Sequence, residues 1–430
     1  MNKRILILFL VLFSVYTVWF LQNGWAEKPK VAISADKTST LNLWKYECLD
    51  TMKTSRDKAR MWTWKILDDH ITSQVNATVA MGANCIAIDT PYDEEFLPVL
   101  KKWVAASRER NLHIWFRGNF SSWEGWFEYP TGMTANEHIQ KTNAFIADNP
   151  NLFADGDIFT PSPEAENGGP FNQVETDEHA VFREYLIREY QEAQNAFKKI
   201  GKNVEVNWLS MNGGLAQRMM DQKTVDAVGK VVAIDHYIKT PQEMGEFIRY
   251  FYNTFGAQVV IGEWGAPIPQ INGEMTEAEQ ADFVRALLEE QYRYKKMVHG
   301  TSYWVLYDGS TSLLNPDGSE REVVEVIRDY FIPGRIQGRL TDKEGKPIVN
   351  ASIVVGDRAE TIYTDLGGNY EVTAPAGNVR LAMKHKDFRT VIKNVTLKRD
   401  TVYKRNYKLT PVSHAGFMEK IQDRLRGLFR

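Results

Sequence analysis

Three glutamates in this sequence stand at the ends of short apolar segments, where a side chain can reach solvent. Glu263 closes the apolar run 259–262, and Glu164 and Glu166 follow the run 158–161. Two carboxyl groups in different surroundings can share a reaction, one as the protonated acid and the other as the ionised nucleophile or base. We therefore treat Glu263, Glu164 and Glu166 as candidate catalytic residues.

Further polar and aromatic side chains stand at the ends of other apolar segments, where they can bind and orient a polar ligand. They are Asp89, Arg117, Asn119, Trp123, His236, Tyr237, Trp264 and Trp304. Two roles stay open for Arg117, an active-site contact and a structural ion pair with Asp89. Trp123 and Trp264 are either ligand platforms or packing residues. No metal-ligand spacing accompanies His236, so we expect it to orient a neighbour and expect no metal site.

The segments that carry these residues alternate with longer amphipathic stretches from about residue 40 onward, which is typical of repeated βα units. Helical spacing predicts helices over 96–110, 134–148, 176–200 and 277–296. The predicted strands are 43–49, 84–89, 112–118, 156–161, 203–209, 231–237, 258–263 and 300–306. Eight such units predict a (β/α)8 barrel over residues 27–333, an α/β fold whose active site forms at the carboxyl ends of the strands. The candidate residues therefore converge on one mouth.

Residues 335–410 have a different pattern. Short β-type runs alternate with Asp/Gly turns, which predicts a small all-β sandwich. The runs 338–342 and 364–370, with Gly345-Lys346-Pro347 between them, resemble the carboxypeptidase regulatory-like domain. This resemblance implies an accessory domain. The last residues, 411–430, predict a basic amphipathic helix.

The first residues predict export. Lys3 and Arg4 precede an uncharged stretch from Ile5 to Leu21, and small residues follow at 24 and 26. We interpret residues 1–26 as a signal peptide or an N-terminal membrane anchor, which places the rest of the chain outside the cytoplasm, secreted or membrane-attached. The formal net charge of -3 argues against nucleic acid as a partner.

The chain has two cysteines, Cys48 and Cys85. An exported chain can join them in a disulfide. Because Cys85 lies inside an apolar run, the sequence favours buried, unpaired thiols.

Three of these segments resemble motifs of clan A glycoside hydrolases, particularly the cellulase and mannanase family. The run 259–265, Val-Val-Ile-Gly-Glu-Trp-Gly, resembles that family's strand-seven motif, in which the Glu is the nucleophile. His236-Tyr237 resembles its strand-six His-x-Tyr region, although here the two residues are adjacent. Trp304 resembles the strand-eight Trp that forms a floor under the sugar. The resemblance implies that Tyr237 hydrogen-bonds the nucleophile Glu263.

Strand four departs from the family, which has Asn-Glu-Pro at this place. Here Pro163 stands where the Asn is expected, and Glu164 takes the acid/base position, with Glu166 as the alternative acid. The resemblance implies a retaining glycoside hydrolase that cleaves β-linked oligo- or polysaccharides with two Glu residues and needs no cofactor. Because of the departure, a catalytically inactive carbohydrate-binding barrel, an adhesin or wall-associated scaffold, stays the alternative.

Overall fold

The computed structural model describes residues 41–412 apart from 62–63, 173–178 and 357–360. The predicted signal or anchor segment 1–26 lies outside the described residues, as does nearly all of the predicted helix 411–430. Within the described part of the chain, no helix has both the length and the apolar character needed to span a membrane.

Eight parallel strands form one curled sheet in the order β4-β3-β2-β1-β8-β7-β6-β5. They are β1 (Tyr46–Asp50), β2 (Cys85–Ile88), β3 (His113–Phe116), β4 (Ile158–Phe159), β5 (Met211–Asn212), β6 (Val231–Asp235), β7 (Gln258–Trp264) and β8 (Val298–Tyr303). The two ends of this order meet, because Phe159 donates its N–H to the carbonyl of Glu205 at 2.8 Å and Glu205 bridges to Ile158. The sheet therefore closes, and the predicted (β/α)8 fold is confirmed.

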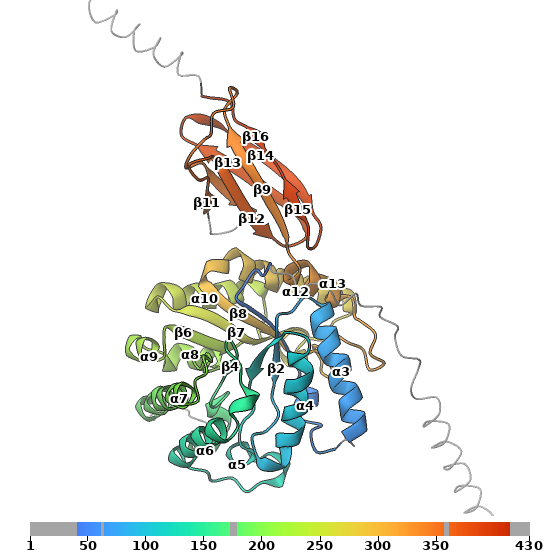
Figure 1. The fold of residues 1–430 in the computed structure, drawn as a ribbon, viewed down its shortest axis with the longest axis vertical. Coiled ribbons are helices and arrows are strands. Elements are labelled where there is room, and N and C mark those ends of the chain that lie inside the picture. Colours follow the sequence, from blue (N-terminus) through green and yellow to red (C-terminus); the bar gives the residue numbers. More distant parts are fainter. Residues whose placement is uncertain (1–40, 62–63, 173–178, 357–360, 413–430) are drawn as a thin grey trace, which may run out of the picture.

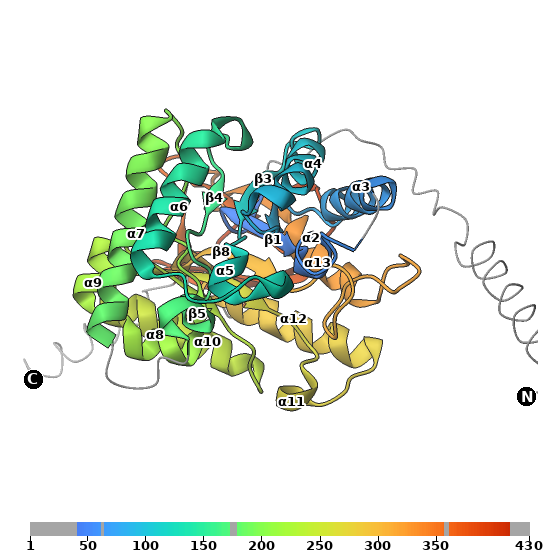
Figure 2. The ribbon, with the colours of Figure 1, turned by 90° about the horizontal axis from the view of Figure 1, so that it is seen from below.

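Helices surround this barrel (Figures 1 and 2). They are α2 (Met52–Ser55), α3 (Trp64–Ala80), α4 (Leu97–Arg108), α5 (Ser121–Glu124), α6 (Ala135–Asp148), α7 (His179–Lys199), α8 (Gly213–Met219), α9 (Gln222–Ala227), α10 (Pro241–Phe255), α11 (Pro269–Asn272), α12 (Glu277–Arg293) and α13 (Val323–Phe331). Three of them, α6, α10 and α12, begin with a Thr and a Glu three residues later that cap each other's backbone.

The predicted fifth strand, 203–209, needs correction. Only Glu205 makes a β-bridge there, to Ile158, and the strand that pairs with β6 is the short β5 further along the chain. The chain pairs first with β4, at Glu205, and then with β6, through β5. A single continuous strand therefore does not form.

Alternate residues of each strand point into the barrel. A buried apolar layer fills the interior, formed by Tyr46, Cys48, Cys85, Ala87, Trp115, Ile158, Trp208, Val231, Ala233 and Val260. Cys48 and Cys85 lie opposite each other in β1 and β2 and form a disulfide, with 4.2 Å between their Cα atoms. The prediction of unpaired thiols was therefore wrong, because it did not consider that register makes the two residues direct neighbours.

Two sheets follow the barrel and pack around a separate core, one antiparallel and one mixed, because β15 and β16 pair with β9 in parallel. One has the order β11-β10-β13-β14, and the other β12-β9-β15 with β16 beside β9. The strands are β9 (Gly334–Thr341), β10 (Ser352–Val355), β11 (Thr361–Tyr363), β12 (Asn369–Ala374), β13 (Gly377–His385), β14 (Phe388–Leu397), β15 (Val402–Lys404) and β16 (Tyr407–Lys408). The predicted sandwich is confirmed.

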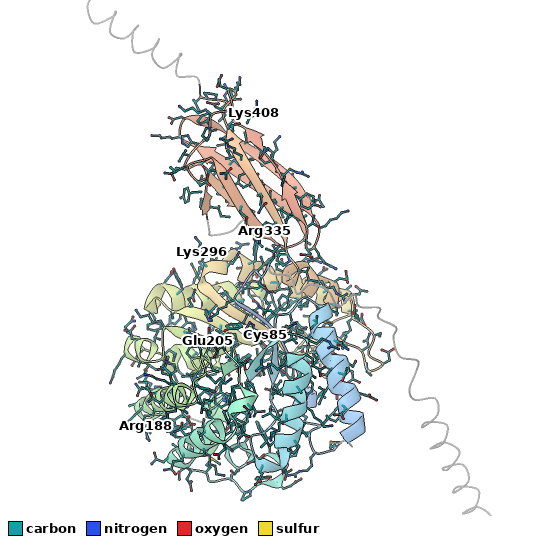
Figure 3. The ribbon with its side chains drawn as sticks, viewed as in Figure 1. Cys85, Arg188, Glu205, Lys296, Arg335 and Lys408 are labelled. Carbon is teal, nitrogen blue, oxygen red and sulfur yellow. A yellow bond between two sulfur atoms is a disulfide. The ribbon has the colours of Figure 1, made fainter. Side chains whose placement is uncertain are left out.

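The sandwich is joined to the amino-terminal end of the barrel, opposite the mouth. Strand β9 begins at Gly334, three residues after α13 ends. Arg399 of the sandwich hydrogen-bonds to Asp329 at 2.7 Å and to Glu325 at 2.9 Å, both on α13. Lys296 and Arg335 mark the two sides of this junction (Figure 3). The sandwich therefore leaves the mouth, meaning the carboxyl ends of β1 to β8, uncovered.

Candidate active site

Arg117 is the centre of the mouth. It follows β3 two residues after the inward-facing Trp115, so it also points inward, and its side chain is buried. Its guanidinium contacts four carboxylates from four other strands. These are Asp50 at 3.2 Å, Asp89 at 3.6 Å, Asp235 at 2.9 Å and Glu263, to which it also hydrogen-bonds. Both roles considered for Arg117, the active-site contact and the ion pair with Asp89, are therefore present together.

Glu263 is held from two sides. Arg117 donates to its Oε1, and the hydroxyl of Tyr237 donates to its Oε2 at 2.7 Å. The backbone N–H of His236 donates to the Glu263 carbonyl at 2.7 Å, which fixes the end of β6 against β7. One partner is a cation and the other a hydroxyl donor, so both carboxylate oxygens of Glu263 are paired. Burial and the nearby carboxylates raise the pKa of Tyr237 well above its ordinary value, so this hydroxyl stays a donor.

Glycine before the nucleophile candidate has a steric reason. A Cβ added to Gly262 would lie 2.4 Å from Oδ1 of Asp235. Any larger residue would force the end of β6 away from β7. Gly262 thus lets two carboxylates, Asp235 and Glu263, lie at the same level of the mouth.

Glu164 lies across the mouth from this pair. One carboxylate oxygen each of Glu164, Asp235 and Glu263 lies within 4.8 Å of the others. Burial raises the pKa of Glu164 to about 8; the charge of Glu263 adds to the rise, and Arg117 opposes it. Its backbone is in the left-handed region, with φ of 44°, and its N–H donates to the Ser210 carbonyl at 2.9 Å. Glu164 is therefore a carboxyl group that favours its protonated form, close to Glu263.

Glu166 has a different position. Its Oε1 accepts the backbone N–H of Asn212 at 2.9 Å, and the carboxyl does not belong to the group of three around Glu263. Burial raises its pKa, and the Asn212 N–H opposes this rise. Of the two candidate acids, the structure brings Glu164 to Glu263.

The mouth has more carboxyl groups than cations. Arg117 faces the four carboxylates named above, and Glu164 is the fifth carboxyl of the cluster. Burial raises the pKa of Asp50 to about 7 and the pKa values of Asp89 and Asp235 well above their ordinary range, although Arg117 opposes this effect. Burial therefore favours the protonated form at four of the five, whereas Glu263 has two hydrogen-bond donors of its own.

Of the three predicted tryptophans, Trp304 is the one whose side chain is partly exposed. It is half-buried, its ring meets the Tyr237 ring edge-on at 5.8 Å, and the Lys53 ammonium lies 5.8 Å from its centre. A flat ring beside Glu263 and Tyr237 suits the face of a sugar.

The platform role considered for Trp264 and Trp123 is corrected to packing. Trp264 is 0% exposed and donates its Nε1–H to Thr301 at 2.7 Å. Trp123 is 1% exposed and stacks on Tyr185. Residue type alone did not separate these two rings from Trp304, because the difference lies in burial.

Three other predicted binding residues are also buried. Asn119 is 0% exposed, and its side chain hydrogen-bonds to other protein groups. Asp89 forms an ion pair with Arg117. His236 packs on Phe247, and burial lowers its pKa to about 4, so the ring is neutral. These residues support the mouth from below, and direct binding through Asn119 or Asp89 would require the mouth to open.

Asp50 and Asp235 are site residues that the sequence analysis did not select. Both stand two positions beyond an inward-facing residue, Cys48 in β1 and Ala233 in β6, so counting by twos along each strand identifies them.

The group Glu164, Asp235 and Glu263 has the spacing to hold a metal ion among the residues that the structure describes. Two of the three carboxylates already accept hydrogen bonds from Arg117, so a divalent ion would compete with a guanidinium that is part of the fold. The donor set therefore fits a metal poorly.

Residues 335–410 match the family model of the carboxypeptidase regulatory-like domain, which confirms the resemblance of the sandwich. A comparison with curated proteins finds no match.

Solved structures with similar folds include several glycosidases. A β-glycosidase named BGL167 is 13% identical, with a TM-score of 0.46, 61% of this chain covered and 86% of that one. A fungal β-1,4-galactanase is 13% identical, with a TM-score of 0.47 and coverages of 66% and 99%. The Bacteroides uniformis β-glucuronidase is 11% identical, with a TM-score of 0.47, and the 85% of this chain that matches spans 46% of that protein's length. At these identities the activity of this chain must be judged from its own residues.

Proposed function

We propose that the protein is a retaining glycoside hydrolase that cleaves β-linked glycans outside the cytoplasm. The observation that carries the proposal is the pair Glu164 and Glu263, two carboxyl groups with oxygens within 4.8 Å of each other and with opposite surroundings. Retaining enzymes separate their carboxyl groups by about 5–5.5 Å, whereas inverting enzymes leave about 6.5–9.5 Å for a water molecule. The short separation supports retention.

The mechanism has two displacements. In the first, Glu263 attacks the anomeric carbon, the bond from this carbon to the bridging oxygen breaks, and Glu164 gives its proton to that oxygen. In the second, Glu164, now ionised, takes a proton from water, and the water oxygen displaces Glu263 from the anomeric carbon. Both carboxyl groups end in their starting states, and the products are two shorter sugars.

The neighbouring residues serve the same steps. Arg117 and Tyr237 hold Glu263 in position, and their hydrogen bonds to it weaken as it forms the covalent bond and loses its negative charge. Burial keeps Glu164 protonated up to about pH 8, so it is a proton donor at neutral pH. Trp304 is the platform under the sugar.

The proposed location rests on the sequence of the N-terminal segment, a basic start followed by an uncharged apolar stretch. It is tested by expressing the full chain and assaying the culture medium, the membrane and the cytoplasm separately. Protein confined to the cytoplasm would contradict it.

The test of the activity is reducing-sugar release by residues 27–430 on a panel of β-glucans, β-mannans and β-xylans, with Glu263→Gln and Glu164→Gln beside the wild type. We expect release by the wild type on at least one glycan and loss of release in both variants. Binding without release, equal in all three proteins, would instead favour an inactive carbohydrate-binding barrel.

A further inference from the structure

Glu124 is a carboxylate near the mouth that the proposed mechanism does not use. It ends α5, which follows β3, and its side chain is partly buried. The charges of Glu166 and Arg56 act on Glu124, and the charge of Glu124 acts on Glu164, so Glu124 lies near the acid side of the mouth.

A chain of buried hydrogen bonds holds Glu124 from behind. Asn119 donates its Nδ2–H to Oε1 of Glu124 at 2.7 Å. The Asn119 Oδ1 accepts from the Phe120 N–H at 2.8 Å and lies 2.7 Å from Nε2 of His138. Because that oxygen is an acceptor only, Nε2 must carry a proton, and the amide can present only its NH2 group to Glu124.

The far end of this chain fixes the His138 ring. Its Nδ1 contacts Oε1 of Glu189, which also accepts the Tyr185 hydroxyl at 2.9 Å. His138, Glu189 and Asn119 are each no more than 1% exposed. Buried hydrogen bonds hold Asn119 and His138 in one arrangement, and this chain ends at a single carboxylate oxygen of Glu124.

The other oxygen of Glu124 is free to accept a ligand. Among the residues that the structure describes, none donates a hydrogen bond to Oε2. Burial raises the pKa of Glu124 to about 7, while Asn119 and Arg56 oppose this rise. Trp126, two residues further on, is partly exposed and has the Arg56 guanidinium 4.8 Å from its ring centre.

We propose that Glu124 is a sugar-binding residue that accepts a hydroxyl of the glycan beside Glu164 and selects neutral glycans against uronates. The inference rests on the proposed function and deepens it. Rejection of uronates follows from charge and burial, because a sugar carboxylate at this place would lie beside the Glu124 carboxylate and two further carboxyl groups, with no cation of its own to pair with among the described residues. A neutral sugar offers hydroxyl donors to the same oxygens.

The experiment measures binding by calorimetry in the Glu263→Gln background, so that turnover is not required. The probes are cellohexaose, mannohexaose, xylohexaose and a mannuronate hexamer, which differs from mannohexaose by its carboxylates. Glu124→Ala and Glu124→Gln are compared with Glu128→Gln, a control whose side chain is 92% exposed and pairs only loosely with Arg60. Thermal unfolding of each variant confirms folding, and the isosteric Gln variant serves if Ala does not fold.

We expect Glu124→Ala to weaken the best neutral hexasaccharide about tenfold or more, since a hydrogen bond to a charged group is lost. Glu124→Gln should reduce the difference in affinity between mannohexaose and the mannuronate hexamer. Glu128→Gln should change neither the affinity for the neutral hexasaccharide nor this difference. The inference would be overturned if Glu124→Ala binds neutral glycans with unchanged affinity. It would also be overturned if the difference in affinity between the two hexamers is unchanged in Glu124→Gln.

The two proposals fail separately. Cleavage by the wild type with no dependence on Glu124 would overturn the role of Glu124 and leave the glycosidase intact. Glu124-dependent binding without cleavage would support this role and overturn the glycosidase. If no probe binds and none is cleaved, both proposals are overturned.

Discussion

Carboxyl groups at the two ends of the barrel have different surroundings, and their pKa values shift in opposite directions. At the amino-terminal end, Glu205 contacts Lys45 and lies 2.8 Å from His299, and these partners lower its pKa to about 2 against the effect of burial. At the mouth, four carboxylates contact Arg117, and the pKa of Glu164 beside them rises to about 8. A carboxylate paired with its own cations stabilises the fold. Carboxyl groups crowded around one cation have perturbed pKa values, which are typical of groups that transfer protons in catalysis.

The sharpest test of this contrast pairs Glu263→Gln with Glu205→Gln. We expect Glu263→Gln to lower kcat about 10⁴-fold or more, because the nucleophile is removed. Glu205→Gln should lower the free energy of unfolding and leave kcat near the wild-type value. Kinetics on the best glycan and urea denaturation measure both; a Glu205→Gln enzyme that is equally inactive but folded would break the comparison.

Glu164→Gln should separate activity from stability. We expect kcat to fall about 10²- to 10⁴-fold with the loss of the general acid. At pH 8.5 the variant should be more stable than the wild type, because a neutral amide replaces a carboxyl that burial and Glu263 disfavour when charged. The wild-type activity itself should decline as the pH rises through about 8. Activity that persists unchanged to pH 10 would contradict the role of Glu164.

Arg117→Met tests whether the carboxyl cluster depends on this guanidinium. Its removal leaves buried carboxylates unpaired, so we expect unfolding to become easier by about 3–5 kcal/mol. The loss should be larger at pH 8 than at pH 5, where more of the carboxyls are protonated. Arg110→Met, on the exterior with a half-exposed side chain, should change stability by less than about 0.5 kcal/mol. Equal losses for the two variants would show that the cluster does not need Arg117.

The disulfide lies in the interior layer between the two ends. Replacing both Cys48 and Cys85 with Ala should lower stability by about 2–4 kcal/mol, because the bond closes a loop across a sequence separation of 37. We expect kcat to change little, since neither sulfur contacts the mouth. Thermal unfolding with and without a reductant gives an independent reading. Unchanged stability in both experiments would mean that the bond does not form.

Stability should also depend on pH. A carboxyl whose pKa is raised by folding binds its proton more tightly in the folded state, so its contribution to stability is lost as pH rises from about 4 toward the raised value. Glu47, Asp50, Glu124 and Glu164, with pKa values of about 8, 7, 7 and 8, act in this direction. His70 and His236, with pKa values lowered to about 4, act oppositely but only below about pH 6.5. Stability should therefore fall between pH 6.5 and 8.5; a rise over that window would contradict the assigned shifts.

Much of the mouth follows from the sequence. The rule that sites form at strand ends placed Glu263, Glu164, Arg117 and Tyr237 at one mouth, and the structure brings them together. The same rule with a period of two would have included Asp50 and Asp235, because inward positions repeat along a strand.

Other features depend on contacts that no local pattern contains. The disulfide required the register between β1 and β2, and the burial of Trp123 and Trp264 required the packing of helices around them. The break in the predicted fifth strand arises because one segment pairs with two different neighbours. The chain from Glu189 to Glu124 joins α5, α6 and α7, so spacing along the sequence does not reveal it.

The central claim is that Glu263 is the nucleophile of a retaining reaction. The most direct measurement is mass spectrometry of the protein after exposure to activated 2-deoxy-2-fluoro-β-glycosides of glucose, mannose and xylose, which trap a glycosyl-enzyme. The account predicts one added sugar on the peptide that contains Glu263, and none in Glu263→Gln. An adduct on another residue, or hydrolysis of these glycosides with no adduct, would contradict it.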